Sequence, residues 1–319
     1  MSVFEAIIQG IIQGLTEFLP VSSSGHLAIS SHILGMGEGN LFFNVMLHLG
    51  TLLAVCTVYY KLIGKLIKAF IKTVSQIVHK EYSWNKMDEY QNMLVMLIVG
   101  LIPLFLLFVP IPFGNGLSTK DLAEIWSEKD GYLIVVGISL IVTSILISVG
   151  NISNKMTERA YKKRKIVRKK GAGRYHINII DALSIGIAQL FAAIFPGLSR
   201  SGSTLAMGEI RGLNKQKSLD YAFILGVPSI IAAGILEGKD AVAAGDFTGD
   251  MVFPVIVGVI VSAIVGFIAI LLFRWMLMKD RMYIFVAYTA IVGAIIIIIS
   301  CAELSSGNNI FTGKELSFA

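Results

Sequence analysis

The sequence contains little charge and almost no cysteine. Only 15% of its 319 residues are Asp, Glu, Lys or Arg, whereas soluble domains carry about a quarter. The two cysteines, Cys56 and Cys301, lie far apart and form no CxxC pair, which argues against a disulfide framework or a cysteine zinc site. The HExxH, EF-hand, Walker A and GxSxG motifs are also absent. The sequence thus gives no support for a zincin, an EF-hand protein, a P-loop enzyme or an α/β-hydrolase.

Apolar residues make up 55% of the chain, and the mean hydropathy is +0.74. Six apolar runs have about 20 residues each, enough for a helix to cross the hydrocarbon core of a bilayer. The sequence therefore predicts an all-α polytopic membrane protein. The predicted spans are residues 41–60, 93–112, 131–150, 219–236, 251–272 and 282–300.

Two further segments, 2–35 and 177–207, are apolar at both ends and broken in the middle. Each contains a proline followed by a cluster of serine and glycine and then a second short apolar stretch. Irregular backbone at membrane depth is tolerated only where protein or a water-filled cavity satisfies its polar groups. We therefore predict that each segment forms a re-entrant helical hairpin, entering and leaving the membrane on the same side.

The basic residues are distributed unevenly between the two sides of this topology. Of the 27 Lys and Arg residues, 22 lie in the loops of one side and four on the other, so the first side is predicted to be cytoplasmic. Residues 151–176 then form a basic cytoplasmic linker and 301–319 an extracytoplasmic tail. The run KKRKIVRKK (162–170) resembles a nucleic-acid-binding patch, but between two spans it indicates contact with anionic lipid headgroups, and no nucleic-acid partner is expected.

An internal repeat relates the two broken segments. At an offset of 176 residues Gly10 matches Gly186, Gln13 matches Gln189 and Pro20 matches Pro196. Each repeat, 1–150 and 177–300, then consists of a hairpin and three spans, and the odd number of spans inverts the second repeat. Inverted-topology repeats place their site near the midplane, where broken helices meet.

The two hairpins carry different chemical groups at their breaks. The first contains Glu17 and His26, and the second contains Arg200. Ionisable groups within membrane segments are rare and usually face a cavity or a partner. If the two tips meet, the carboxylate and imidazole of one hairpin face the guanidinium of the other. Glu5, Gln9, Gln13 and Glu17 recur every four residues, and for Glu5 and Gln9 a structural polar seam is the favoured interpretation.

Serine and glycine clusters follow both prolines, as SSSGH (22–26) and SRSGST (199–204). Hydroxyl groups and free backbone N–H groups at the start of a half-helix form a cradle for an anion, and arginine adds donors that match phosphate oxygens. An alternative is that these residues only cap and pack the half-helices. His26 is suited to proton transfer or nucleophilic attack near neutral pH. A divalent cation is expected to bridge Glu17 and a phosphate, because Mg²⁺ and Ca²⁺ prefer oxygen ligands.

These residues resemble the signatures of the undecaprenyl-diphosphatase family, also called the bacitracin-resistance proteins. The (E/Q)xxxE signature is matched by Gln13 to Glu17, and PGxSRSxxT by Pro196 to Thr204. Many members carry Glu where this chain has Gln13. The resemblance implies an enzyme of the bacterial plasma membrane that hydrolyses a polyprenyl diphosphate with Mg²⁺ or Ca²⁺ at a site open to the outer face. It implies recycling of the lipid carrier for cell-wall synthesis and resistance to bacitracin.

The predicted site combines both hairpins. The expected catalytic residues are Glu17, which also binds the metal, His26, Arg200, Ser23 and Ser199. The expected substrate-binding residues are Gln13, Ser22, Ser24, Gly197, Ser201, Gly202 and Thr204. His26 is expected either to activate water or to attack phosphorus directly, and Ser23 or Ser199 is the less favoured nucleophile. A transporter or flippase for a phosphorylated lipid or anion is the alternative function, supported by the inverted repeat. A homodimer is a further open possibility.

Overall fold

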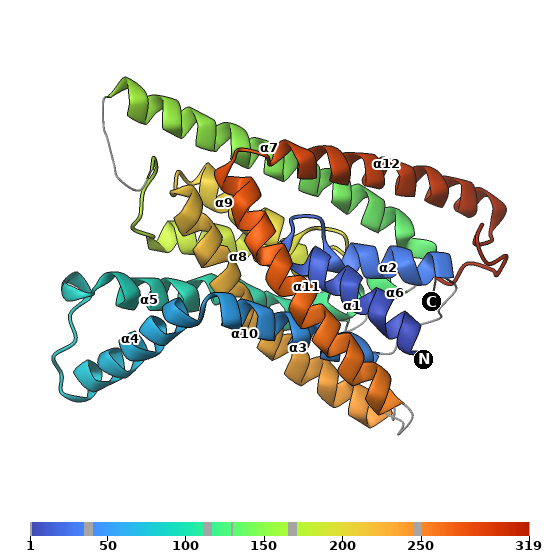
Figure 1. The fold of residues 1–319 in the computed structure, drawn as a ribbon, viewed down its shortest axis with the longest axis horizontal. Helices are drawn as coiled ribbons and strands as arrows, with labels where there is room; N and C mark the ends of the chain where they lie inside the picture. Colours follow the sequence, from blue (N-terminus) through green and yellow to red (C-terminus); the bar gives the residue numbers. More distant parts are fainter. Residues whose placement is uncertain are drawn as a thin grey trace.

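The structure, a computed structural model, describes residues 2–34, 41–110, 117–128, 130–164, 171–244 and 251–318. In these ranges the chain forms helices and no strand (Figure 1). Five helices are long and apolar enough to cross a membrane. The prediction of an all-α polytopic membrane protein is thereby confirmed. The five are α5 (Glu89–Leu101) with its 3-10 extension η2 (Ile102–Phe108), α7 (Leu133–Lys163), α10 (Lys215–Ala244), α11 (Val252–Met278) and α12 (Tyr283–Ser306).

Both predicted hairpins are pairs of short helices. The first consists of α1 (Val3–Phe18) and α2 (Ser23–Leu34), and the second of α8 (Ile179–Ile194) and α9 (Arg200–Ile210). The two hairpins pack on different partners, α1 along α11 and α8 along α5. Each hairpin thus packs along a helix of the other predicted repeat. The inverted relation between the two repeats stays a prediction.

The sixth expected span, 41–60, is bent at its end. Helix α3 (Leu41–Val58) is followed at once by α4 (Tyr60–Val78), and the two axes differ by 84°. No helix is predicted between the spans 41–60 and 93–112, so α4 is an addition to the prediction. Its short apolar segments are interrupted by lysines, so a search for continuous apolar runs does not find it.

Three other boundaries differ from the predictions. Helix α7 continues through residue 163, so the predicted linker 151–176 is helical in its first half; residues 165–170, most of the basic run, lie outside the described residues. Helix α6 (Thr119–Glu128) was not predicted. The tail 301–319 begins as the last turns of α12 and then folds back, where Gly131 N–H donates to the Ser317 carbonyl at 2.9 Å.

Aromatic and small residues hold the bundle together. The ring of Phe223 on α10 lies 5.5 Å from that of Phe18 on α1 and 5.8 Å from that of Phe273 on α11. Glycines permit close helix contact: a Cβ on Gly14 would lie 2.8 Å from the Ser262 carbonyl oxygen of α11, and small residues let helix backbones approach in a membrane. The first hairpin is therefore fixed against α10 and α11 immediately beside Glu17.

Candidate functional site

The breaks in the two hairpins are built in the same way. Helix α1 ends at Phe18 and is followed by Pro20, and Ser22 adopts a left-handed backbone with φ of 73°. Helix α8 ends at Ile194 and is followed by Pro196 and by Gly197 with φ of 90°. Proline stops each helix because it lacks an N–H donor, and the left-handed residue reverses the chain.

The tips of the two hairpins are in direct contact. A Cβ on Gly25 would lie 2.9 Å from the Cα of Gly197, so the two backbones can touch there because Gly25 has no side chain. The Ser201 hydroxyl donates to the Leu19 carbonyl at 3.1 Å, and Gly197 N–H donates to the Ser24 hydroxyl at 3.5 Å. These contacts join the first hairpin to the second at the level of both breaks.

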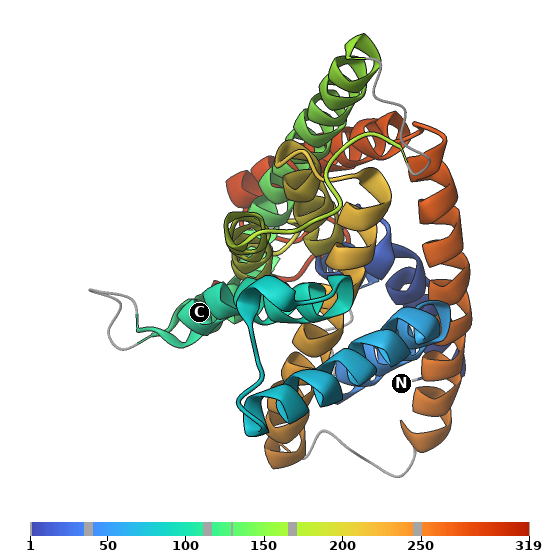
Figure 2. The same cartoon turned by 90° about the vertical axis from the view of Figure 1, so that its left-hand side faces the viewer.

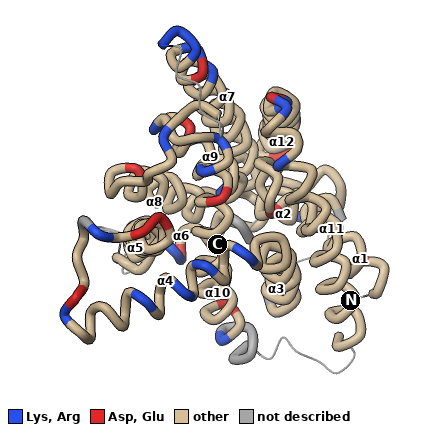
Figure 3. The backbone as a smooth tube through the Cα atoms, turned by 60° about the vertical axis from the view of Figure 1, so that its left-hand side comes forward, with Lys and Arg blue, Asp and Glu red and all other residues tan. Residues whose placement is uncertain are grey.

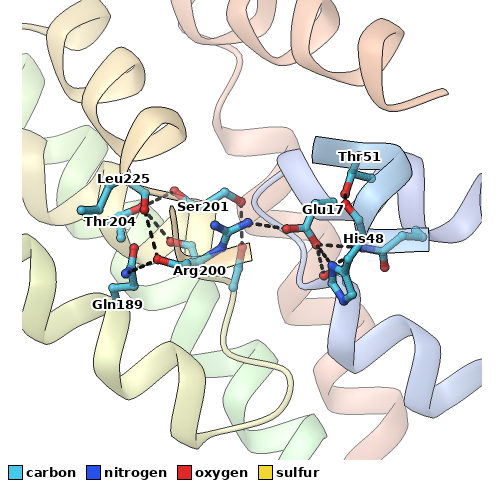
Figure 4. A network of polar contacts seen from close by, with 12 residues as sticks. Glu17, His48, Thr51, Gln189, Arg200, Ser201, Thr204 and Leu225 are labelled. Atoms are coloured by element: carbon cyan, nitrogen blue, oxygen red, sulfur yellow. Dashed lines mark hydrogen bonds and ion pairs between the residues drawn. The ribbon is translucent and has the colours of Figure 1, made fainter. Parts of the chain in front are cut away.

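Glu17 and Arg200 form an ion pair across this contact. Arg200 Nη2 donates to Glu17 Oε1, while Ser23 donates to Oε2 at 2.7 Å and Gln13 Nε2 at 3.0 Å. Figure 4 shows the guanidinium and the carboxylate pointing toward one another from separate elements. Glu17 is buried, at 6% exposure, and both of its oxygens have charged or polar partners, as a buried carboxylate requires.

A polar pocket lies beside this ion pair. Its empty volume is about 270 Å³, part of which is open to solvent. Both hairpins contribute to the walls, so the pocket exists only because the two breaks meet. The lining residues are Thr16, Glu17, Ser22, Ser23, Ser24, Ala192, Leu198, Ser199 and Arg200.

The start of α9 presents Arg200 to the pocket. Ser199 is the N-cap, and its hydroxyl accepts from Gly202 N–H at 3.1 Å. The Ser199 backbone N–H in turn donates to the Thr143 hydroxyl of α7 at 3.0 Å. Gly226 of α10 makes room for the guanidinium, since a Cβ there would lie 2.1 Å from Arg200 Nη1. A helix N-terminus and a cation thus face the same space, which favours an anionic ligand.

Other predicted binding residues contact Ser199 and Arg200 rather than the pocket itself. Thr204 donates to the Arg200 carbonyl at 2.8 Å, and the Ser201 hydroxyl lies 3.2 Å from that of Ser199. Gly197, Ser201, Gly202 and Thr204 do not line the pocket. Of the predicted substrate-binding residues, the structure brings only Ser22 and Ser24 to the pocket wall.

His26 lies away from the pocket wall. Its Nδ1 is 2.8 Å from the Ser22 carbonyl oxygen and its Nε2 is 2.7 Å from the Tyr288 hydroxyl on α12. The carbonyl accepts only from a protonated Nδ1, so in the neutral ring Nε2 accepts from Tyr288. Both nitrogens are therefore occupied outside the pocket, and the imidazole holds the Ser22 turn in place. Its chemical role stays a prediction.

Sequence reasoning did not assign three neighbours of the site. His48 on α3 places Nδ1 2.9 Å from Gln13 Nε2 and 3.6 Å from Glu17 Oε2 (Figure 4). Thr16 lines the pocket, and Thr143 binds Ser199. His48 and Thr143 lie in apolar spans without a polar cluster around them, so no local pattern marks them. Only Thr16 had a signal, as the direct neighbour of Glu17.

The oxygen donors of the site suit a divalent cation that takes only one or two of its ligands from the protein. Within the described residues no group of three or more His, Cys, Asp or Glu side chains is placed to hold a metal, and Glu17 is the one carboxylate of the pocket wall. Beside it, Gln13 Oε1 is buried and has no hydrogen-bond partner in the described chain. Mg²⁺ commonly uses one or two carboxylates and takes its other ligands from water and phosphate, which agrees with this donor set.

Comparisons with known proteins agree with one another. The profile of the family described as "Bacitracin resistance protein BacA" matches residues 6–295. The chain is 37% identical over 304 residues to an undecaprenyl-diphosphatase of Alkaliphilus metalliredigens, with 94% of this chain and 99% of the relative covered. It is 32% identical to one of Bacteroides fragilis and 33% identical to one of Methanosphaera stadtmanae, with the same coverage.

Proposed function

Because the chain belongs to the bacitracin resistance protein BacA family, we infer that it hydrolyses undecaprenyl diphosphate to undecaprenyl phosphate and inorganic phosphate. Its relatives carry the name undecaprenyl-diphosphatase and share nearly their whole length with this chain. The single observation that carries the assignment to a site is the meeting of Arg200 and Glu17 at a polar pocket between two broken helices. Removing the diphosphate lipid accounts for resistance to bacitracin.

Arg200 is the proposed phosphate-binding residue. It is the one cation of the pocket wall, and its guanidinium matches two phosphate oxygens. The N-terminus of α9 adds partial positive charge behind it. When a diphosphate enters, its terminal phosphate competes with Glu17 for the guanidinium, so that the ion pair opens and the carboxylate is released for chemistry. Hydrolysis of a phosphoanhydride needs mainly such positioning and charge stabilisation.

Ser23 is the proposed nucleophile. Its hydroxyl lines the pocket and donates to Glu17 at 2.7 Å, the arrangement of a nucleophile with its base. Ser23 Oγ attacks the terminal phosphorus, its proton passes to Glu17, and the bond to the bridging oxygen breaks to release undecaprenyl phosphate. Water then hydrolyses the phosphoserine to free phosphate. Ser199 is less suitable, because its hydroxyl caps α9.

Glu17 and Gln13 Oε1 are the proposed ligands of a Mg²⁺ or Ca²⁺ ion. When bound, the cation neutralises charge on the phosphate oxygens. The proposed location is the bacterial plasma membrane with the pocket open to the outer face, which the excess of Lys and Arg in the loops of the opposite side supports. A homodimer is a further proposal, to be tested by light scattering in detergent.

Phosphate release by the purified protein in detergent tests the function. A detergent solution has no separate compartments, so a transporter or flippase without phosphatase activity would release no phosphate in it. We expect release from undecaprenyl diphosphate and its loss in R200A and E17A. Trapping with substrate labelled at the terminal phosphorus tests the nucleophile. Label on Ser23 is expected; label on His26 would overturn the serine route, and no label would favour direct attack by water.

A further inference from the structure

Helix α4 presents three different faces along its length. One face is buried against α5 through Leu66, Ala69 and Thr73. A second face is apolar and exposed: Ile67, Phe70, Ile71 and Val78 are each more than half accessible. At 3.6 residues per turn the third face, a row of lysines, lies about 130° around the helix from the exposed apolar one. A helix with this division of faces is typical of the membrane interface.

The bend after α3 sets the direction of α4. Because the two axes differ by 84°, α4 runs nearly parallel to the bilayer surface when α3 runs through the membrane. Figures 1 and 2 show α4 beside α5 at the edge of the molecule. Figure 3 shows Lys and Arg along α4 and at the end of α7, and the excess of basic residues in these segments supports a cytoplasmic location for both.

The lysine row consists of residues 61, 65, 68 and 72, spaced as one helical stripe. Two of them have partners within the protein: Lys65 donates to the Tyr90 hydroxyl at 2.7 Å, and Lys72 pairs with Asp88 at 2.8 Å. The hydrogen bond from Lys72 lowers the pKa of Asp88. The carboxylate of Asp88 therefore stays ionised and paired with the ammonium group of Lys72. Lys61 and Lys68 have no ion pair within the described residues.

We propose that α4 lies in the headgroup region of the cytoplasmic leaflet, with its exposed apolar face among the acyl chains, and that Lys61 and Lys68 bind the phosphates of anionic phospholipids. Lysines at a membrane surface are attracted by anionic lipid, and their stems cover apolar surface while the ammonium groups reach the headgroups. This surface is separate from the proposed phosphatase site, and neither proposal depends on the other.

The depth of α4 is tested by fluorescence quenching in nanodiscs that contain lipids brominated on the acyl chains. Trp84, Trp126 and Trp275 are first replaced by Phe, and a single reporter is introduced by F70W on the apolar face. The matched control is S75W, on the same helix but outside that face. We expect F70W to be quenched strongly and S75W weakly. Equal quenching of the two reporters would overturn the interfacial position.

The preference for anionic lipid is tested in the F70W background with mixed bilayers in which either phosphatidylglycerol or phosphatidylcholine is brominated. We expect excess quenching by phosphatidylglycerol, with local enrichment falling about fivefold for each lysine removed in K61Q/K68Q. The control K162Q/K163Q removes the same charge at the end of α7 and is expected to retain the preference. An unchanged preference in K61Q/K68Q, or an equal loss in the control, would contradict the assignment.

Discussion

Arg200 and Glu17 are 183 residues apart in the sequence and form an ion pair at the contact between two re-entrant hairpins. Glu17 is almost fully buried, and Arg200 is the one cation among the described residues that line the pocket. The two residues therefore act as a unit, and the effects of removing them are not expected to add.

Removal of either partner is expected to abolish most of the activity. E17A and R200A should each lower phosphate release by roughly 100-fold or more, the loss typical of a lost stabilising group. The double variant E17A/R200A should release phosphate nearly as fast as either single variant. The reason is that each single substitution already removes the joint contribution of the two residues. Turnover of the three purified variants measures this; a multiplicative loss in the double variant would show that the residues act independently.

Gly226 is expected to position Arg200 without touching the substrate. In G226A the new methyl group displaces the end of the arginine side chain, which is flexible enough to move, so the fold should persist. A displacement of about 1 Å is expected to lower turnover by about 100-fold, with little change in melting temperature. The control G234A lies on the same helix with its nearest neighbours at 3.9 Å or beyond; a similar loss there would point to the helix rather than to Arg200.

Gly197 is expected to be essential for stability as well as geometry. Alanine there would be strained at φ of 90°, at a cost of roughly 1–3 kcal/mol, and its Cβ would lie 2.6 Å from the Val136 carbonyl oxygen. G212A is a matched control, since Gly212 has φ of 74° and open space around it. Thermal melting should therefore show a larger decrease for G197A than for G212A. Equal decreases would mean that backbone strain alone matters and that the close packing against Val136 of α7 contributes nothing.

The buried pair of His32 and Glu303 is expected to fasten the first hairpin to the last helix. His32 Nε2 lies 2.8 Å from Glu303 Oε1, which also accepts from Ile310 N–H at 2.9 Å. E303A removes the carboxylate that His32 Nε2 contacts in a buried setting, and leaving a buried polar group without such a partner typically costs about 1–3 kcal/mol. The exposed pair of Lys120 and Glu124 provides the control E124A, for which about 1 kcal/mol or less is expected. Comparable melting temperatures for the two variants would contradict the fastening role.

Most of the long helices and the polar groups at the two hairpin breaks could be predicted from the sequence alone. Long apolar runs predict spanning helices because a bilayer leaves no other way to satisfy the backbone. Proline with serine and glycine marks both hairpins, and the rarity of charge in apolar segments predicts a functional role for Glu17 and Arg200. The cap at Ser199 agrees with the capping role that the serine clusters left open, whereas the left-handed turn at Ser22 was not predicted.

Which side chains share one pocket depends on the packing of distant segments and could not be predicted from the sequence. His48 contacts Gln13 and Glu17 although its own span shows no sign of it, and His26 contacts Tyr288 of the last helix, a partner that its motif does not indicate. The bend between α3 and α4 is likewise not predicted by any periodic pattern of apolar residues. Each of these outcomes depends on contacts between segments distant in sequence, such as Gln13 with His48 or His26 with Tyr288, and local patterns carry no information about which distant surfaces will meet.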